Sequence, residues 1–176
     1  MKATGVIRRI DDLGRIVIPK EIRKTLRIKE GESLEIFVDN NEQVILKKHS
    51  MVKKLSDLAQ ELTDSIHTFS KNNVLITDND NILAISGNLK KQYLNLPISE
   101  ELENKINRRE EMLERHSKLI HIIEDEGIEA TFAVSPIIVN GDTVGLVMIL
   151  SNKEIVTEDD FKLAQIAAKF LTTHLE

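Results

Sequence analysis

The first fifty residues alternate short apolar runs with turn-forming residues. Residues 4–10 (TGVIRRI) and 15–19 (RIVIP) are rich in β-branched side chains, which is typical of strands. The DDLG stretch between them, residues 11–14, is the kind of short loop that closes a hairpin. The pattern therefore predicts a β-hairpin with its tip at residues 11–14 and with Ile10 opposite Arg15.

Cations gather on this hairpin and on the segment that follows it. In the predicted register Arg8, Arg9 and Arg15 lie close together near the tip, where like charges repel one another. Pro19 suits the first turn of a helix and good helix formers follow it, so residues 19–28 are expected to be helical. Four cations at helical spacing would form one stripe of that helix: Lys20, Arg23, Lys24 and Arg27.

Two further strands are predicted at residues 33–39 and 43–48, with a turn at residues 40–42. The unit is then strand, strand, short helix, strand, strand in about fifty residues. A unit of this size buries too little surface to be stable alone unless a metal, a disulfide or a second copy supports it. The chain has no cysteine, so a dimer is expected.

Charge is distributed unevenly along the chain. The net charge is −5, yet residues 1–50 contain 11 Lys and Arg against 8 Asp and Glu, whereas residues 51–176 contain 13 against 21. For any single arginine the ordinary interpretation is a solvated side chain on a small helix. The hairpin cluster and the helix cluster together favour an anion site, and a phosphate backbone fits such a site best.

Residues 1–49 closely resemble the AbrB-type swapped-hairpin DNA-binding domain of bacterial transition-state regulators, above all in GRIVIPKEIRKTL. The resemblance implies an all-β barrel, with one short helix, that forms only when the hairpins of two chains interleave. It also implies A·T-rich promoter DNA as a partner, contacted by Arg8, Arg15 and Arg23 with Lys24 beside them. Lysine at that last position lacks the bidentate fork of arginine. The full set of expected DNA-binding residues is Arg8, Arg9, Arg15, Arg23, Lys24, Lys2, Lys20 and Arg27.

Residues 51–71 carry a helical pattern and form the expected linker. Six apolar residues follow the spacing 3, 4, 3, 4, 3, namely Val52, Leu55, Ala59, Leu62, Ile66 and Phe69. This seam is shorter than the three to four heptads that identify a free coiled coil. Two interpretations stay open: an amphipathic helix that covers a sheet, or a helix that pairs across a dimer.

Residues 72–176 alternate strands with helices. A hairpin is expected at residues 73–87, a helix at 97–114 carrying Leu113, a strand at 118–126 and a second hairpin at 129–152. The order predicts an α+β sandwich around an antiparallel sheet.

Two local signals mark ends of these elements. Asn140-Gly141 favours a type I′ hairpin turn, and Thr157 followed by Asp160 is close to a capping box at the start of the last helix. One face of that helix is lined by Phe161, Ala164, Ala168, Leu171 and Leu175.

This C-terminal part resembles a GAF domain, a common bacterial small-molecule sensor. The two parts together resemble the sporulation regulators of the AbrB family. That resemblance implies a cytoplasmic transcription regulator that acts late in spore development in the forespore and both activates and represses genes. It implies a homotetramer of two swapped dimers, joined through the sensor domains. The residues expected at the oligomer contacts are Val52, Leu55, Ala59, Leu62, Ile66, Phe69, Phe161, Ala168 and Leu171.

Motifs of catalysis are missing from the sequence. There is no GxxxxGK[ST] and no GxGxxG, and the five histidines occur without HExxH spacing or cysteine partners. An enzyme, a metal site and a cofactor are therefore not expected. No apolar run approaches the ~20 residues of a membrane span, so no membrane partner is expected either. Ser135-Pro136 and Ser86-Gly87 could line a pocket for a small molecule, but the sequence names no ligand.

The alternative function is that of an antitoxin, a class of inhibitor proteins that uses the same swapped-hairpin fold. Antitoxin chains usually end in a short acidic tail that wraps a toxin. Here roughly 120 residues with strand patterning and a capped helix follow instead. The sequence therefore favours the DNA-binding regulator.

Overall fold

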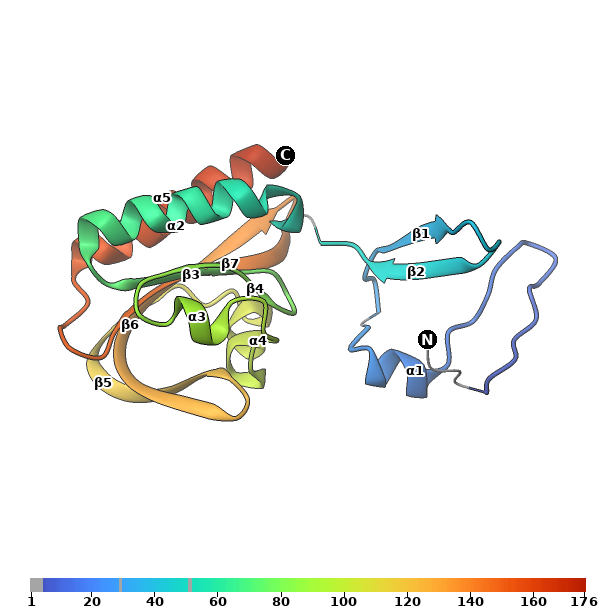
Figure 1. The fold of residues 1–176 in the computed structure, drawn as a ribbon, viewed down its shortest axis with the longest axis horizontal. Coiled ribbons are helices and arrows are strands. Elements are labelled where there is room, and N and C mark those ends of the chain that lie inside the picture. Colours follow the sequence, from blue (N-terminus) through green and yellow to red (C-terminus); the bar gives the residue numbers. More distant parts are fainter. Residues whose placement is uncertain (1–4, 29, 51) are drawn as a thin grey trace. The chain divides into compact units, whose positions relative to one another are not determined.

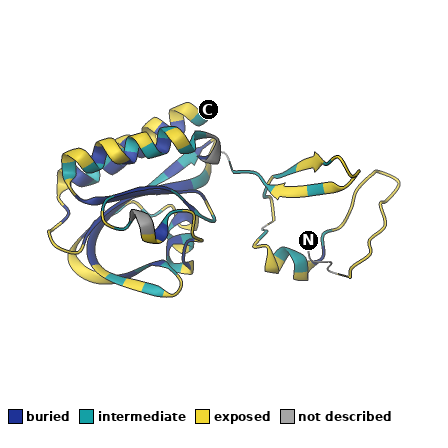
Figure 2. Cartoon of the chain, viewed as in Figure 1, coloured by how far each residue is buried: buried dark blue, intermediate teal, exposed yellow. Residues whose placement is uncertain are grey.

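The computed structural model describes residues 5–28, 30–50 and 52–176, apart from the side chains at positions 53, 54, 90 and 91. The chain divides into two compact units, one ending at His49 and the other comprising Ser50–Glu176 (Figure 1). The second unit has a buried interior, whereas the first is exposed along most of its length (Figure 2).

The first unit contains one short helix and one hairpin. Strands β1 (Leu34–Val38) and β2 (Val44–Lys48) pair in antiparallel fashion with Val38 opposite Val44, which confirms the second predicted hairpin. Helix α1 spans Lys20–Thr25.

Helix α1 ends earlier than predicted. The N–H of Ile28 donates to the carbonyl of Arg23 at 2.7 Å, that of Arg27 donates to the carbonyl of Lys24 at 3.2 Å, and Arg27 has a φ of +52°. This is a Schellman ending with an arginine at the left-handed position. Arg27 therefore lies beyond the helix, and the predicted stripe of four helical cations is reduced to Lys20, Arg23 and Lys24.

The first predicted hairpin has a formed tip but no strand ladder. In the described part of the chain, residues 5–10 and 15–19 belong to no strand, which corrects the expectation for a single chain. Apolar side chains here and on the second hairpin face outward, with Ile7 92% and Ile36 70% exposed. Among the described residues of the first unit, neither of these two segments is paired with a strand.

The second unit is built on a five-stranded antiparallel sheet of order β4-β3-β7-β6-β5. This arrangement confirms the predicted antiparallel α+β sandwich. The strands are β3 (Asn73–Thr77), β4 (Ile82–Ser86), β5 (Met112–Ile123), β6 (Glu126–Val139) and β7 (Asp142–Ser151).

Helices cover both faces of this sheet. On one face lie α2 (Ser56–Ser70), preceded by the 3₁₀ helix η1 (Val52–Leu55), and α5 (Glu158–Leu175). On the other lie α3 (Lys90–Tyr93) and α4 (Glu100–Asn107), as Figure 1 shows.

Alternate residues of the strands feed two separate apolar cores, because side chains of a strand point to opposite faces in turn. Leu75 packs with Tyr93 and Leu102 beneath α3 and α4. Its neighbour Val74 packs on the opposite face, with Ala59 of α2 among others. The sheet is therefore covered on both sides.

Two predicted ends are confirmed. Asn140 and Gly141 have φ values of +50° and +86°, as a type I′ turn requires. The Thr157 hydroxyl accepts the N–H of Asp160 at 3.2 Å, while the Asp160 carboxylate accepts the N–H of Thr157 at 2.8 Å, forming the capping box.

The helix predicted at residues 97–114 is shorter, and α3 was not anticipated. Arg109 has a φ of +54°, and the N–H of Glu110 donates to the carbonyl of Lys105 at 2.9 Å, which ends α4 in a second Schellman arrangement. Leu113 consequently lies in β5 rather than on a helix face.

Candidate nucleic-acid interface

Asp11 holds the tip of the first hairpin together. Its Oδ1 accepts the N–H of Leu13 at 3.1 Å and that of Arg15 at 2.7 Å. Its own N–H donates to the carbonyl of Arg15 at 3.0 Å, so Asp11 rather than Ile10 lies opposite Arg15. Gly14 has a φ of +77°, a conformation that glycine adopts without strain. The turn is thus one residue tighter than the predicted register.

Arg15 projects from this tip in contact with the same carboxylate. Its Nε donates to Oδ2 of Asp11 at 2.8 Å, while the arginine side chain is 70% exposed. The backbone N–H of Arg15, and next its guanidinium, hold the pKa of the Asp11 carboxyl below its ordinary value. Asp11 therefore stays charged near neutral pH, beside a cation that is open to solvent.

The remaining cations fall into two groups. Arg8 and Arg9 are exposed on the segment that precedes the turn. Lys20 and Lys24 are exposed on α1. Arg23 is half-buried, and its Nε is buried without a hydrogen-bond partner among the described residues. A buried N–H without an acceptor is unfavourable.

Two members of the predicted DNA-binding set stand apart. Lys2 lies outside the described residues. Arg27 is exposed beyond the end of α1 at the left-handed position.

Most residues assigned to oligomer contacts lie in the core instead. Leu55 and Leu62 are partly buried against the core beneath α2 and α5, and Phe161 is half-buried. The others are buried there because η1, α2 and α5 turn these faces to their own sheet: Val52, Ala59, Ile66, Ala168 and Leu171. Those five side chains support the fold and are not available to a partner.

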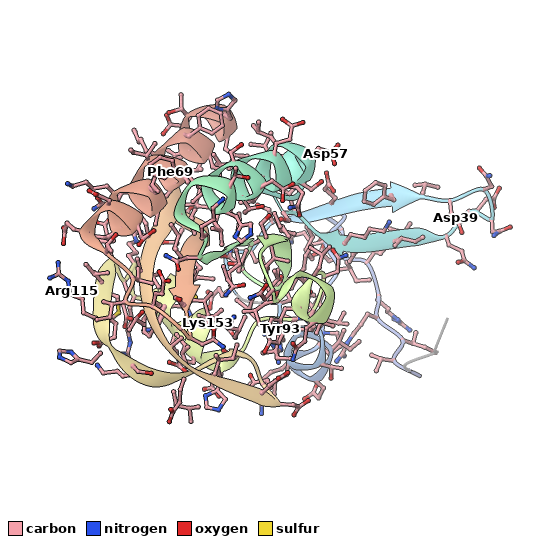
Figure 3. All side chains as sticks on the ribbon, turned by 60° about the vertical axis from the view of Figure 1, so that its left-hand side comes forward. Asp39, Asp57, Phe69, Tyr93, Arg115 and Lys153 are labelled. Atoms are coloured by element: carbon pink, nitrogen blue, oxygen red, sulfur yellow. The ribbon has the colours of Figure 1, made fainter. Side chains whose placement is uncertain are left out.

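Large apolar side chains remain exposed on these two helices, and Phe69 of the predicted set is one of them. Phe69 of α2 is 79% exposed and is labelled in Figure 3. On α5, Ile166 is 64% exposed, and the Phe170 ring lies 4.1 Å from that of His174. Ile166 and Phe170 are spaced i, i+4, so they lie on the same side of the helix. This spacing is visible in the sequence, but the oligomer contacts were assigned from the heptad pattern instead.

Polar contacts fasten α2 to the edge strand β4. The Gln60 amide donates to the carbonyl of Ile85 at 3.2 Å and accepts the N–H of Ile85 at 3.4 Å, so it pairs with the edge much as a neighbouring strand would. The Ser86 hydroxyl donates to the Asp64 carboxylate, and its oxygen lies 3.0 Å from the Thr63 hydroxyl oxygen. Helix α2 thus covers the sheet of its own unit, the first of the two interpretations of the linker pattern.

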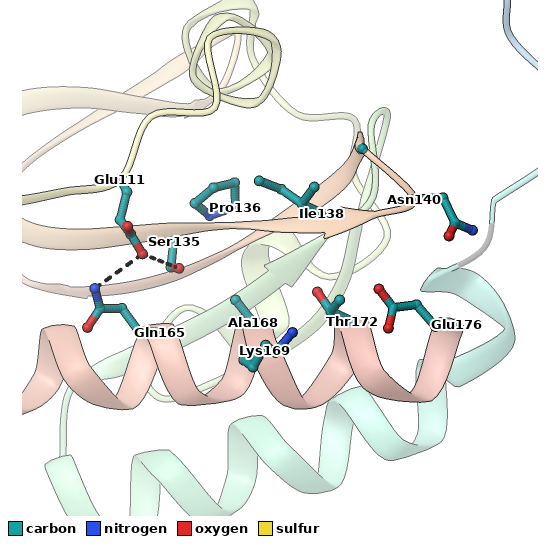
Figure 4. Close-up of a pocket in the computed structure, with 11 residues that line it drawn as sticks. Glu111, Ser135, Pro136, Ile138, Asn140, Gln165, Ala168, Lys169, Thr172 and Glu176 are labelled. Carbon is teal, nitrogen blue, oxygen red and sulfur yellow. Dashed lines mark hydrogen bonds between the residues drawn. The ribbon is translucent and has the colours of Figure 1, made fainter.

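A groove of about 410 Å³ runs between α5 and β6 (Figure 4). Ser135 and Pro136 line it, as the sequence suggested. Ser86 is instead hydrogen-bonded to Asp64 of α2. At one end the Glu111 carboxylate accepts hydrogen bonds from Ser135 at 3.0 Å and from Gln165 at 3.2 Å.

The described part of the chain offers neither a metal-binding cluster nor a membrane-spanning helix. Among residues 5–28, 30–50 and 52–176, no group of three or more His, Cys, Asp or Glu is placed to hold a metal ion. In the same residues no helix combines the length and apolar character needed to cross a membrane.

Comparison with known proteins accounts for the whole chain. Residues 54–176 match the family model described as the stage V sporulation protein T C-terminal, transcription factor. Stage V sporulation protein T of Bacillus subtilis strain 168 is 47% identical over 100% of this chain and 99% of that protein. The chain belongs to the stage V sporulation protein T family. Membership of this family makes the chain a transcription regulator connected with sporulation.

The two units of this stage V sporulation protein T family member have separate relatives. Residues 7–54 match the model for antidote-toxin recognition MazE, bacterial antitoxin. The transition state regulatory protein AbrB of Bacillus subtilis is 57% identical over 49 residues, 28% of this chain and 50% of that protein. These matches confirm the resemblance of the first unit to the AbrB type.

The second unit has the fold of a GAF domain. The GAF domain of an Acinetobacter phosphoenolpyruvate-protein phosphotransferase covers 73% of this chain and 84% of its own, with a TM-score of 0.56 and 14% identity. At this identity the likeness concerns the fold, and it confirms the predicted sandwich.

Proposed function

We propose that this protein binds double-stranded promoter DNA through Arg8, Arg15, Arg23 and Lys24, with Arg9, Lys20, Arg27 and Lys2 adding to the positive surface. The observation that carries the proposal is Arg15, which projects from the hairpin tip with 70% of its side chain exposed, in a segment where Arg8 and Arg9 are exposed as well. The proposed DNA-binding domain is residues 1–50, that is, the first unit together with Ser50. Residues 51–71 are the linker, and residues 72–176 form the sensory or oligomerisation domain.

The DNA-binding form is a swapped dimer. Supporting this, apolar residues of the first unit are exposed on both hairpins, including Ile7, Val17, Ile36 and Val44. Burying such surface is the main favourable contribution to association. Interleaved hairpins would cover these side chains and would give residues 5–10 and 15–19 strands to pair with. A dimer also doubles the number of cations that face DNA.

Recognition relies on groove shape more than on many base contacts. Helix α1 has six residues, too few to lie along a major groove as a recognition helix. Cations on a turn and on a short helix can follow phosphates and sense the narrow minor groove of A·T-rich DNA. A·T-rich promoters are therefore the proposed targets.

The second unit joins two dimers into a tetramer. The residues proposed for this contact are the exposed Phe69 of α2 and the exposed Ile166 and Phe170 of α5. Linking two DNA-binding dimers makes the second DNA contact intramolecular, with gains in avidity on the order of 10² to 10⁴ when the geometry allows. Assembly then contributes to DNA binding as strongly as the arginines do.

Small-molecule sensing and the developmental role complete the proposal. The groove beside α5 is the candidate place for a ligand, which can regulate DNA binding only by preferring one assembly state. The proposed role is to activate and repress late sporulation genes in the forespore, and the identity to stage V sporulation protein T along the full chain supports its connection with sporulation. An antitoxin role is less well supported, because a folded unit stands where a toxin-wrapping tail would be.

A salt titration of the full chain tests the DNA-binding proposal. Each neutralised phosphate contributes about −0.9 to the slope of log K against log salt, so four cations in each of two chains give roughly −7. Changing Arg8 and Arg15 together to Ala should make that slope shallower by about 3.6 on the same arithmetic. Arg108→Ala, at an exposed site in the second unit, removes one charge as a control. If the double variant binds as the control does, the proposal is rejected.

A further inference from the structure

The two hairpin turns of the first unit have the same hydrogen bonds. Oδ1 of Asp39 accepts the N–H of Asn41 and that of Gln43, both at 2.9 Å, as Oδ1 of Asp11 accepts those of Leu13 and Arg15. The N–H of Asp39 donates to the carbonyl of Gln43 at 3.0 Å, matching the bond from Asp11 to Arg15. In both turns, therefore, Oδ1 of the aspartate accepts hydrogen bonds from backbone N–H groups of the turn itself. Figure 3 shows Asp39 at its hairpin tip.

The second carboxylate oxygen distinguishes the two turns. Oδ2 of Asp11 accepts the Nε–H of Arg15 at 2.8 Å. Oδ2 of Asp39 lies 3.5 Å from the side-chain nitrogen Nδ2 of Asn41. The residue equivalent to Arg15 in this turn is Gln43. The contact between Asp11 Oδ2 and Arg15 is thus not needed to form this kind of turn.

Because Asp11 binds Arg15 through Nε, the two Nη atoms of Arg15 can still donate to another partner. A guanidinium has five N–H donors, one on Nε and four on its two Nη atoms. Bidentate contacts to a base edge or to a phosphate can use the Nη end. A carboxylate on Nε fixes the plane of the group and leaves that end open.

We propose that Asp11 is a positioning residue for DNA recognition, holding the Arg15 guanidinium through Nε so that its Nη end is aimed at the DNA. This inference rests on the proposed DNA-binding function. Asp11 also places a negative charge beside phosphates, which opposes binding to any DNA sequence. Its contribution is therefore to discrimination between sequences, and its removal should leave overall affinity equal or higher.

Asp11→Asn is the decisive variant. Asparagine keeps an Oδ1 acceptor for the turn but presents an NH₂ group, which cannot accept the Nε–H of Arg15. Asp39→Asn makes the same chemical change in the matched turn, where no arginine is held. Both variants should melt at nearly the same temperature as the unaltered full chain.

Dissociation constants of A·T-rich and G·C-rich duplexes, measured at one salt concentration, give the readout. We expect the preference for A·T-rich DNA to fall by about fivefold or more in Asp11→Asn and to stay within about twofold in Asp39→Asn. An unchanged preference in Asp11→Asn overturns the inference, as does an equal fall in both variants. Absence of any preference in the unaltered protein overturns it as well.

Arg15→Lys provides the second test, because lysine keeps the charge but has no Nε and no planar fork. If Asp11 acts through Arg15, adding Asp11→Asn to Arg15→Lys changes the preference no further. A further fall of the same size in that background overturns the inference. Failure of the unaltered protein to bind DNA, or of Arg8→Ala with Arg15→Ala to weaken binding, would instead reject the proposed function itself.

Discussion

A Cβ atom on Gly145 would lie 2.0 Å from the carbonyl oxygen of Thr77. Gly145 stands opposite Ile137, where the register of β6 and β7 shifts, and the next residue, Leu146, pairs with Thr77 of β3. Two backbones approach each other here more closely than any side chain allows, which is a common reason for glycine inside a strand.

Gly145→Ala is expected to destabilise the second unit by about 1–3 kcal/mol or more, since either β7 or β3 has to move. Chemical denaturation of the full chain measures the change. Gly127→Ala is the control, because a Cβ there meets the side chains of His121 and of the exposed Leu119, which can shift. If Gly145→Ala were as stable as the unaltered protein, the close approach would be wrong.

The attachment of α2 to the edge strand depends on Gln60. Gln60→Ala removes both hydrogen bonds to the backbone of Ile85 and should reduce the free energy of unfolding by about 1–2 kcal/mol. The amide of Ile85 should also exchange with solvent faster. Gln92→Ala, which removes an exposed amide bonded to Glu126, should stay within about 0.5 kcal/mol. Equal effects of the two variants would contradict a specific role for Gln60.

Substitutions of Ile66 and Phe69, which lie on the same helix, distinguish an effect on folding from an effect on assembly. Ile66 is 5% exposed, so Ile66→Asp buries a carboxylate in the core and should unfold the second unit. Phe69 is exposed, so Phe69→Asp should leave the melting temperature nearly unchanged while lowering the mass seen in sedimentation from tetramer to dimer. Asn104→Asp, which adds a charge at an exposed position of α4, is the control. A Phe69→Asp protein that still forms tetramers would exclude this surface.

Tyr93 gives a direct optical test of the core beneath α3, because it is the chain's one tyrosine. Burial, and next the negative charge of Glu126, raise its pKa from 10.0 to about 12. The neutral phenol is thus favoured by folding, so its contribution to stability is full below pH 10 and is lost as the pH rises toward 12. Ultraviolet titration should show a midpoint near 12 when folded and near 10 when unfolded. Glu126→Gln should lower the folded midpoint only in part.

Local signals in the sequence predicted much of the second unit. Asn140-Gly141 and the pair Thr157 and Asp160 act within four residues, so their conformations follow from neighbouring chemistry. Arg109 shows the limit, since a left-handed arginine is rare and nothing in its residue type announces the end of α4. The heptad pattern of α2 was equally ambiguous: a seam at Ala59 and Ile66 fits a sheet as well as it fits another helix.

In the candidate DNA-binding site, too, the sequence predicts some features and not others. Charge counting identified Arg8, Arg9 and Arg15, because clustering along the chain is visible in sequence. The contact of Arg15 with Asp11 was not foreseen, since the predicted register placed Ile10 there. Strand formation at residues 5–10 could not be read from one chain, because pairing depends on a partner that hydrophobic periodicity does not reveal.

The exposed apolar arms of the first unit also have a consequence for gene dosage. With the dimer proposed above, the DNA-competent species forms from two chains, so at low expression its amount rises with the square of the chain concentration. A twofold change in synthesis would then alter promoter occupancy up to fourfold before saturation. A developing cell could convert a modest rise in translation into a sharp onset of regulation without any ligand.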